Sequence, residues 1–262
     1  MDHKNQLNPG TNARGKLGRR RFIQQFVVGS AYSVVAGREW LATLVADCTP
    51  TSSSNGILRV KVSDFPALQN ANGSVRLLFN PINATSQFPA NQSFYPVIVN
   101  RGTGDQFFTL NSRCMHQSCV VPPFDGSLGF STCPCHGSRY AINGAVLRGP
   151  TTLPLAKFTN SFDGTTLCIE IPNLGYTVTG STVASSIGPR FSLQFPTKNR
   201  LNYEVRFRQS LADSGTIVPF SSTEGGAATT SVLTGNNQPA TIFVDRTSDR
   251  GFYAVGLQVT EG

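Results

Sequence analysis

The sequence predicts an all-β protein behind a short N-terminal leader. Its 262 residues include 25 Gly and 16 Pro, which favour frequent turns. After residue 55 the apolar residues fall in short runs bounded by Gly, Pro, Asn or Asp, as strands separated by turns do. Hydrophobic residues make up 39% and charged residues 14%, the reverse of a disordered chain. The sequence has no uninterrupted apolar stretch of about 20 residues, which excludes a multi-span membrane protein.

The net charge of +8 is concentrated in the leader. Residues 1–46 contain seven Lys or Arg against two acidic residues, a surplus of five. The other residues hold the remaining fifteen basic and twelve acidic side chains, a surplus of only three. A nucleic-acid-binding domain would carry its basic residues on the folded body. We therefore expect no nucleic-acid partner.

The leader has the pattern of an export signal. Residues 18–23 are Gly-Arg-Arg-Arg-Phe-Ile, and an uncharged, modestly apolar stretch follows over residues 26–37. Paired arginines before a bulky apolar pair resemble the twin-arginine signal. The plainer alternative is a surface helix that begins with a basic run. We expect residues 1–46 to be a twin-arginine signal or anchor, which makes the protein periplasmic or cell-surface and limits membrane contact to this segment.

Residues 47–172 form the first predicted β domain. Strands are predicted at residues 57–62, 75–79, 96–99, 107–110 and 166–171. Asn143-Gly144 and Asp163-Gly164 are dipeptides favoured in tight hairpins. Residues 84–91 are expected to form an exposed loop.

Residues 173–262 form a second predicted β domain, without cysteine. Strands are predicted at residues 190–195, 201–207, 217–221, 229–233, 241–244 and 251–259. Their number and spacing predict a small antiparallel β-sandwich of the immunoglobulin or fibronectin type III kind. No cluster of residues in it suits catalysis, so we interpret it as an accessory domain.

Two short boxes gather most of the metal-ligating residues. Four of the six Cys and two of the three His lie in Cys114-Met115-His116-Gln117-Ser118-Cys119 and in Cys133-Pro134-Cys135-His136-Gly137-Ser138-Arg139-Tyr140. Thiols and imidazoles concentrated in this way indicate a metal centre. Two Cys and two His also suit a structural zinc site.

The two boxes closely resemble those of the Rieske iron–sulfur family. The resemblance implies a 2Fe–2S cluster in which Cys114 and Cys133 bind one iron and His116 and His136 bind the other. Two neutral imidazoles in place of two thiolates lessen the negative charge of the cluster, and the family's potentials reach roughly +300 mV. It also implies a Rieske-type antiparallel β domain with a cluster-binding subdomain.

Further residues of the boxes match the high-potential, disulfide-containing type of this family. The resemblance implies a Cys119–Cys135 disulfide, which persists only in an oxidising compartment. It also implies that the hydroxyls of Ser138 and Tyr140 donate hydrogen bonds to sulfur and so favour the reduced state. The segment 149–154, which begins with Gly149 and Pro150, resembles the proline loop that covers the cluster from a third side.

Cys48 and Cys168 lie outside the boxes. They suit a disulfide that fastens the segment after the leader to the first β domain. Alternatively, Cys48 carries a lipid anchor and Cys168 is a buried small side chain. The sequence leaves both alternatives open.

Three functions fit these residues. The first is an electron-transfer protein or oxidoreductase subunit that carries single electrons between redox partner proteins, such as a cytochrome. The second is the quinol-oxidising Rieske subunit of a cytochrome bc-type complex, and the third is a cell-surface binding module with a structural or sensing cluster. Quinol-oxidising relatives usually have Leu and Gly after the first-box His, where this chain has Gln117 and Ser118. We therefore favour the first function, in which any enzyme activity belongs to a partner.

Overall fold

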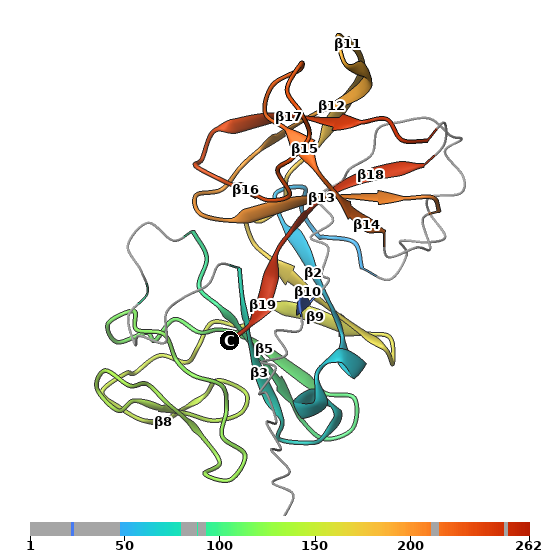
Figure 1. The fold of residues 1–262 in the computed structure, drawn as a ribbon. Coiled ribbons are helices and arrows are strands. Elements are labelled where there is room, and N and C mark those ends of the chain that lie inside the picture. The colour runs from blue at the N-terminus through green and yellow to red at the C-terminus, as the bar shows by residue number, and fades with distance from the viewer. Residues whose placement is uncertain (1–21, 24–47, 80–87, 89–92, 211–214, 249–250) are drawn as a thin grey trace, which may run out of the picture.

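The computed structural model describes residues 22–23, 48–79, 88, 93–210, 215–248 and 251–262. Across those residues the strand pairs are all antiparallel, and the helical segments are two short 3-10 turns, η1 (Val62–Asp64) and η2 (Pro66–Gln69). The predicted all-β class is confirmed (Figure 1). Within this part of the chain no helix has the length and apolar character to cross a membrane. Apart from β1 (Phe22–Ile23), the predicted leader lies outside the described residues, as does most of the predicted loop 84–91.

Two sheets form the base of the first β domain, with strand orders β2-β10-β9 and β1-β19-β3-β4-β5. Their strands, besides β1, are β2 (Gly56–Lys61), β3 (Ser74–Leu78), β4 (Val97–Arg101), β5 (Phe107–Asn111), β9 (Thr159–Phe162), β10 (Thr166–Ile171) and β19 (Val259–Glu261). The five strands predicted here are confirmed to within two residues. Buried side chains of the two sheets, among them Leu58, Leu77 and Ile169, meet in the main hydrophobic core.

A third, smaller sheet carries the second box. It consists of β6 (Ser131–Thr132), β7 (Arg139–Tyr140) and β8 (Val146–Arg148) in that order. Strands of two or three residues are too short for an alternating pattern, so the sequence did not predict them. The predicted turn at Asn143-Gly144 is present between β7 and β8, and Gly144 has φ 81°, which glycine adopts without steric cost.

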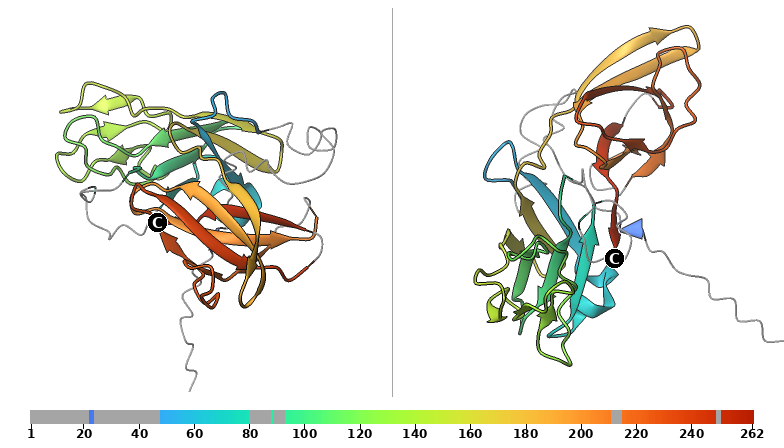
Figure 2. Two further views of the ribbon diagram at one scale, coloured as in Figure 1. Left: turned by 90° about the horizontal axis from the view of Figure 1, so that it is seen from above. Right: turned by 90° about the vertical axis from the view of Figure 1, so that its left-hand side faces the viewer.

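The C-terminal two-sheet unit comprises residues 179–257. One sheet has the order β11-β12-β17-β15; in the other, β14, β16 and β18 all pair with β13. The strands are β11 (Thr179–Ser185), β12 (Gly188–Pro196), β13 (Asn202–Arg208), β14 (Thr216–Val218), β15 (Phe220–Ser221), β16 (Leu233–Thr234), β17 (Pro239–Asp245) and β18 (Phe252–Leu257). Figure 2 shows the unit beside the first β domain. Its assignment to the immunoglobulin or fibronectin type III kind stays a prediction.

Three strands predicted in this unit differ in the structure. Residues 217–221 are divided between two sheets at Pro219, because proline has no N–H to donate to a ladder. Residues 229–233 form a strand only at their end, in β16, so the predicted strand there was wrong in extent. Residues 251–259 are divided at Gln258, and the second piece, β19, leaves the unit to pair with β3.

The C-terminal two-sheet unit and the first β domain share one hydrophobic core. The largest cluster of buried apolar side chains runs from β2 through Tyr176 and into β12, β13 and β17. The Tyr176 hydroxyl donates to the Val255 carbonyl at 2.8 Å. In Figure 1, β19 descends from the upper unit into the lower sheet, where Thr260 lies opposite Leu78. The last strand of the chain therefore belongs to the base of the first domain.

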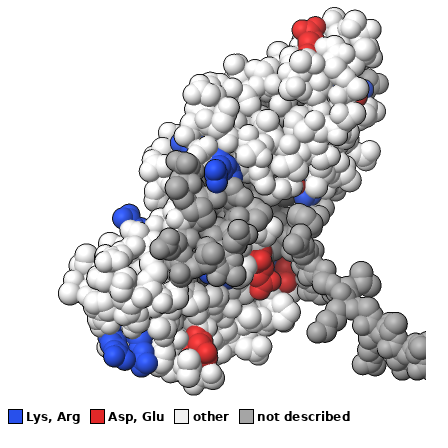
Figure 3. Space-filling view, turned by 60° about the vertical axis from the view of Figure 1, so that its left-hand side comes forward, with Lys and Arg blue, Asp and Glu red and all other residues white. Residues whose placement is uncertain are grey.

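Charged side chains are sparse on the face of the molecule shown in Figure 3. Lys and Arg form small, separate patches on a mostly uncharged surface. This agrees with the sequence, in which residues beyond 46 have only a small basic surplus.

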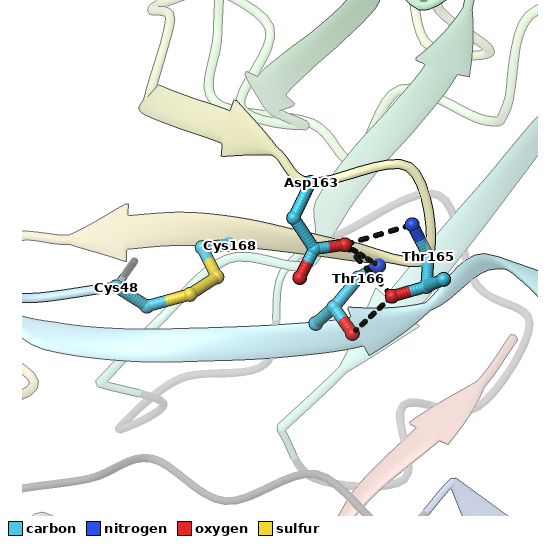
Figure 4. The surroundings of a disulfide bond; sticks show 5 residues. All are labelled: Cys48, Asp163, Thr165, Thr166 and Cys168. Carbon is cyan, nitrogen blue, oxygen red and sulfur yellow. Dashed lines mark hydrogen bonds between the residues drawn. A yellow bond between two sulfur atoms is a disulfide. The ribbon is translucent and has the colours of Figure 1, made fainter. Parts of the chain in front are cut away.

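The structure joins Cys48 to Cys168 in a disulfide (Figure 4), with the two Cα atoms 5.9 Å apart. A thiol that is bound in a disulfide cannot also carry a lipid, so the pairing decides between the two alternatives. The Glu170 carboxylate fastens the same segment, since it accepts hydrogen bonds from the Thr51 amide at 2.6 Å, the Thr51 hydroxyl at 2.7 Å and the Asn55 side chain at 2.8 Å.

Candidate metal centre

The first box forms a closed loop. The Cys114 amide donates to the Cys119 carbonyl at 2.8 Å, and the Ser118 amide donates to the Cys114 carbonyl at 2.9 Å. These two bonds fold the backbone over and leave Met115, His116 and Gln117 exposed at its tip. The loop thus separates a buried thiol from an exposed imidazole two residues away.

The second box repeats this hydrogen-bond pattern. The Cys133 amide donates to the Ser138 carbonyl at 2.8 Å, and the Gly137 amide donates to the Cys133 carbonyl at 3.0 Å. His136 is exposed at the tip of this loop. The fifth residue of each loop has a left-handed backbone, with φ 59° at Ser118 and φ 74° at Gly137. The two boxes are therefore two copies of one loop geometry.

The two loops place the four predicted ligands in two pairs, an inner pair of thiols and an outer pair of imidazoles. The Cys114 and Cys133 side chains are each 1% exposed, hydrogen-bonded to each other and not in a disulfide. The His116 and His136 rings are exposed, with their centres 4.8 Å apart and their planes perpendicular. The two thiols could therefore bind a metal centre from the protein interior, and the two imidazoles could bind it from the solvent side.

The two thiols differ in acidity. Burial raises the pKa of the Cys133 thiol. Burial also acts to raise the pKa of Cys114, but hydrogen bonds from the Tyr140 hydroxyl, the His116 and Gln117 amides and the Cys133 thiol together outweigh it, so the pKa is lowered. The thiolate is the form that binds a metal, and the surroundings of Cys114 favour that form.

The second box supplies two hydroxyl groups, and that of Tyr140 lies beside the inner pair. The Tyr140 hydroxyl oxygen is 3.2 Å from the Cys114 sulfur, and burial raises the pKa of Tyr140 to about 12. The hydroxyl therefore keeps its proton at ordinary pH and can donate it to sulfur. Ser138 is fully buried, and its oxygen accepts the Thr151 amide at 3.1 Å, which leaves its own hydrogen available for donation.

A disulfide joins the two loops. Cys119 is bonded to Cys135 with the Cα atoms 6.5 Å apart, as the resemblance implied. The sulfur of Cys133 lies within 4.8 Å of both disulfide sulfurs. The bridge therefore fixes the spacing of the loops and covers one side of a candidate ligand.

Thr151 is buried and hydrogen-bonded to the two hydroxyl-bearing residues of the second box. Gly149 and Pro150, which the sequence analysis singled out, are exposed. Their neighbour Thr151 is buried, donates its amide to the Ser138 hydroxyl and has a side-chain hydrogen bond with Tyr140. The sequence does not indicate Thr151 as a site residue, because its burial depends on how the loop folds back over the small sheet.

Two more residues, which the sequence pattern does not indicate, contact the first loop. The Tyr95 hydroxyl donates to the Ser118 carbonyl at 2.7 Å, and the Arg113 Nε donates to the Ser118 hydroxyl at 3.0 Å. Tyr95 lies 23 residues before Ser118 in the sequence, and nothing in its local sequence indicates this contact.

Known proteins match this region of the chain. The Rieske [2Fe-2S] domain family matches residues 80–159. The cytochrome b6-f complex iron-sulfur subunit of a Cyanothece strain is 34% identical over 158 residues, which are 56% of this chain and 80% of that protein. The chain belongs to the Rieske [2Fe-2S] family.

Other members of the Rieske family are similar over shorter segments. The cytochrome b6-f complex iron-sulfur subunit of Prochlorococcus marinus is 53% identical over 60 residues, 23% of this chain. The chain spans only 33% of the length of that relative. The solved plasma membrane Rieske protein PetC3 of Synechocystis is 31% identical, with a TM-score of 0.28 over 30% of this chain and 81% of that one.

The cofactor of this Rieske protein is a 2Fe–2S cluster, and the residues at the site fit it. The inner thiols of Cys114 and Cys133 are buried and have no disulfide partner. The imidazoles of His116 and His136 lie next to each other at the surface. A hydroxyl donor faces a sulfur atom, which a plain structural zinc site does not need. When bound, the cluster accepts and releases one electron.

We expect Tyr140→Phe and Ser138→Ala each to lower the reduction potential by several tens of millivolts. A donor that faces sulfur stabilises the reduced state, and a difference of about 1.4 kcal/mol between the two states corresponds to about 59 mV for one electron. Protein-film voltammetry measures the shift. Tyr176→Phe removes a tyrosine hydroxyl from the core outside the boxes and is the matched control, with an unchanged potential. Unchanged potentials in both site variants would contradict the role of the hydroxyls.

Proposed function

We propose that this Rieske protein carries single electrons between redox partner proteins, with its cluster held by Cys114, His116, Cys133 and His136. One observation carries the proposal: the thiols are buried and the imidazoles are exposed at the tips of the two loops. A partner that docks on the tips meets the histidine side directly, while the sulfur side stays shielded from solvent. Electron transfer needs this short approach and no acid–base or nucleophilic side chain.

The residues around the ligands support the carrier role. The Cys119–Cys135 disulfide and the two matching loops hold the ligands in fixed positions, which limits rearrangement when an electron arrives. The Tyr140 hydroxyl faces a ligand sulfur, and we propose that it and the buried Ser138 hydroxyl donate to the sulfur side and favour the reduced state. We propose residues 47–172 as the cluster-bearing domain and residues 173–262 as an accessory domain whose last strand completes the base sheet.

A quinol-oxidising subunit is the second candidate. The relatives whose names place them in the cytochrome b6-f complex favour it. Against it, the side chain after His116 is the exposed, polar Gln117, where an apolar residue would suit a quinol pocket better. We therefore keep the single-electron carrier as the main proposal.

The full-length protein tests the proposal in a stopped-flow experiment. We expect the reduced protein to deliver one electron per chain to an oxidised c-type cytochrome, and the Cys133→Ser variant, which lacks a ligand, to deliver none. A cluster that is present and reducible but inactive toward cytochromes would contradict the carrier role. Stoichiometric co-purification of a b-type cytochrome from native membranes would also contradict it and favour the quinol-oxidising subunit.

We also propose export through the twin-arginine route. Arg19, Arg20 and Arg21 precede a modestly apolar segment, and the two disulfides of the folded part suit an oxidising compartment. Normal export of a variant with all three arginines replaced by lysine would contradict this route.

A further inference from the structure

Three consecutive residues connect the C-terminal two-sheet unit with the first loop of the metal centre. The Ser93 hydroxyl donates to the Asn199 carbonyl at 3.0 Å, in the connection between β12 and β13. Phe94 packs against the main hydrophobic core. The Tyr95 hydroxyl then donates to the Ser118 carbonyl at 2.7 Å. The segment therefore contacts the C-terminal unit at one end and the first loop at the other.

Ser118 is the residue of the first loop that most needs outside support. It has φ 59°, in the left-handed region that side chains with a Cβ adopt at a cost. Tyr95 holds its carbonyl, and Arg113 holds its hydroxyl with a hydrogen bond of 3.0 Å. The Arg113 guanidinium also lies 5.9 Å from the centre of the Tyr95 ring. The two hydrogen bonds to Ser118 hold its backbone in a left-handed conformation that is unfavourable for serine.

The second loop needs no such support. Its equivalent residue is Gly137, with φ 74°, and glycine enters the left-handed region without penalty. The two loops have the same hydrogen-bond pattern, so the residue at this position is a defined difference between them. Loss of the Tyr95 contact should therefore loosen one loop and leave the other unchanged.

We propose that Tyr95 is a positioning residue for the first ligand loop, and that the C-terminal two-sheet unit supports this loop through Ser93–Tyr95. This inference shares one assumption with the proposed function, namely that His116 is a ligand of the cluster. His116 lies between Cys114 and Ser118 in the loop, so a freer Ser118 lets the imidazole leave its position opposite His136. The C-terminal unit thereby contributes to cluster retention without contacting a ligand.

Amide hydrogen exchange of the full-length, cluster-containing protein tests the inference. In Tyr95→Phe, amides of residues 115–119 should exchange about twofold to tenfold faster, the range expected for one lost hydrogen bond. Amides of residues 134–138 should be unchanged. Tyr176→Phe removes an equivalent hydroxyl-to-carbonyl bond of 2.8 Å in the core and should change neither loop. Unchanged exchange in Tyr95→Phe, or equal acceleration of both loops, would overturn the positioning role.

Two further variants test the link and the strain. Ser93→Ala should also accelerate amide exchange in the first loop, but by less than Tyr95→Phe does. Unchanged exchange in the first loop would overturn the contribution of the C-terminal unit.

Adding Ser118→Gly to Tyr95→Phe should restore slow exchange, because glycine adopts the required φ unaided. Failure to restore it would overturn the strain argument. Iron and sulfide content distinguishes a failure of this inference from a failure of the proposed function. Wild-type protein that lacks iron would contradict the proposed electron-carrier function, whereas hydrogen exchange of its first loop would still test the role of Tyr95.

Discussion

Replacing Cys48 and Cys168 by serine is expected to lower the free energy of unfolding by about 5 kcal/mol. The bond closes a loop of 120 residues, and the chain-entropy estimate for loops of that size is close to this value. Domains are stable by only about 5–15 kcal/mol, so the effect is large. Urea denaturation of the full chain measures it.

The Glu170 contacts decide how much native structure this variant keeps. Thr51 and Asn55 still donate to the carboxylate, so we expect the segment to stay in place and the loss to come from a freer unfolded chain. Cluster content should equal that of the wild type, because neither cysteine lies in the boxes. A change in unfolding free energy of less than about 1 kcal/mol would show that the bridge contributes far less than chain entropy predicts.

Replacing Cys119 and Cys135 by serine is expected to give a folded protein with a labile or missing cluster. The bridge closes a loop of only 16 residues, worth about 3 kcal/mol by chain entropy, and Cys114 and Cys133 cross-link the same loops when the cluster is bound. The larger effect is on cluster retention, because the disulfide sulfurs that lie within 4.8 Å of the Cys133 sulfur are removed.

Iron and sulfide content over time measures the loss in this variant. The Cys48→Ser, Cys168→Ser protein is the matched control, since it also lacks one disulfide but should retain its cluster. The C-terminal two-sheet unit should stay folded in both. Mass mapping of unreduced wild-type protein that finds free thiols at Cys119 and Cys135, with the cluster intact, would contradict the role of the bridge.

The sequence was sufficient to predict the parts of this fold that depend on local pattern. Strands such as β10 have alternating or continuous apolar residues over six positions and end at turn residues. The two boxes were found because their ligands are close in sequence. Strands β6, β7 and β8 are too short to show a pattern, and β11 consists of small and polar residues that are mostly exposed.

The parts that the sequence did not predict depend on distant contacts. The path of β19 into the base sheet is decided by its pairing with β3, almost two hundred residues earlier in the chain. Thr151 joins the site because its loop folds back onto Ser138 and Tyr140. Tyr95 reaches Ser118 through the tertiary fold alone. Such contacts leave no local pattern that sequence reasoning can use.

The EPR spectrum of the reduced, full-length protein tests the central claim most directly. If Cys114 and Cys133 bind one iron and His116 and His136 bind the other, the spectrum has the low average g value of mixed cysteine and histidine ligation. A spectrum with the higher average g value of all-cysteine ligation would contradict the ligand set. Protein that contains zinc, lacks iron and sulfide, and gives no signal would contradict the iron–sulfur centre itself.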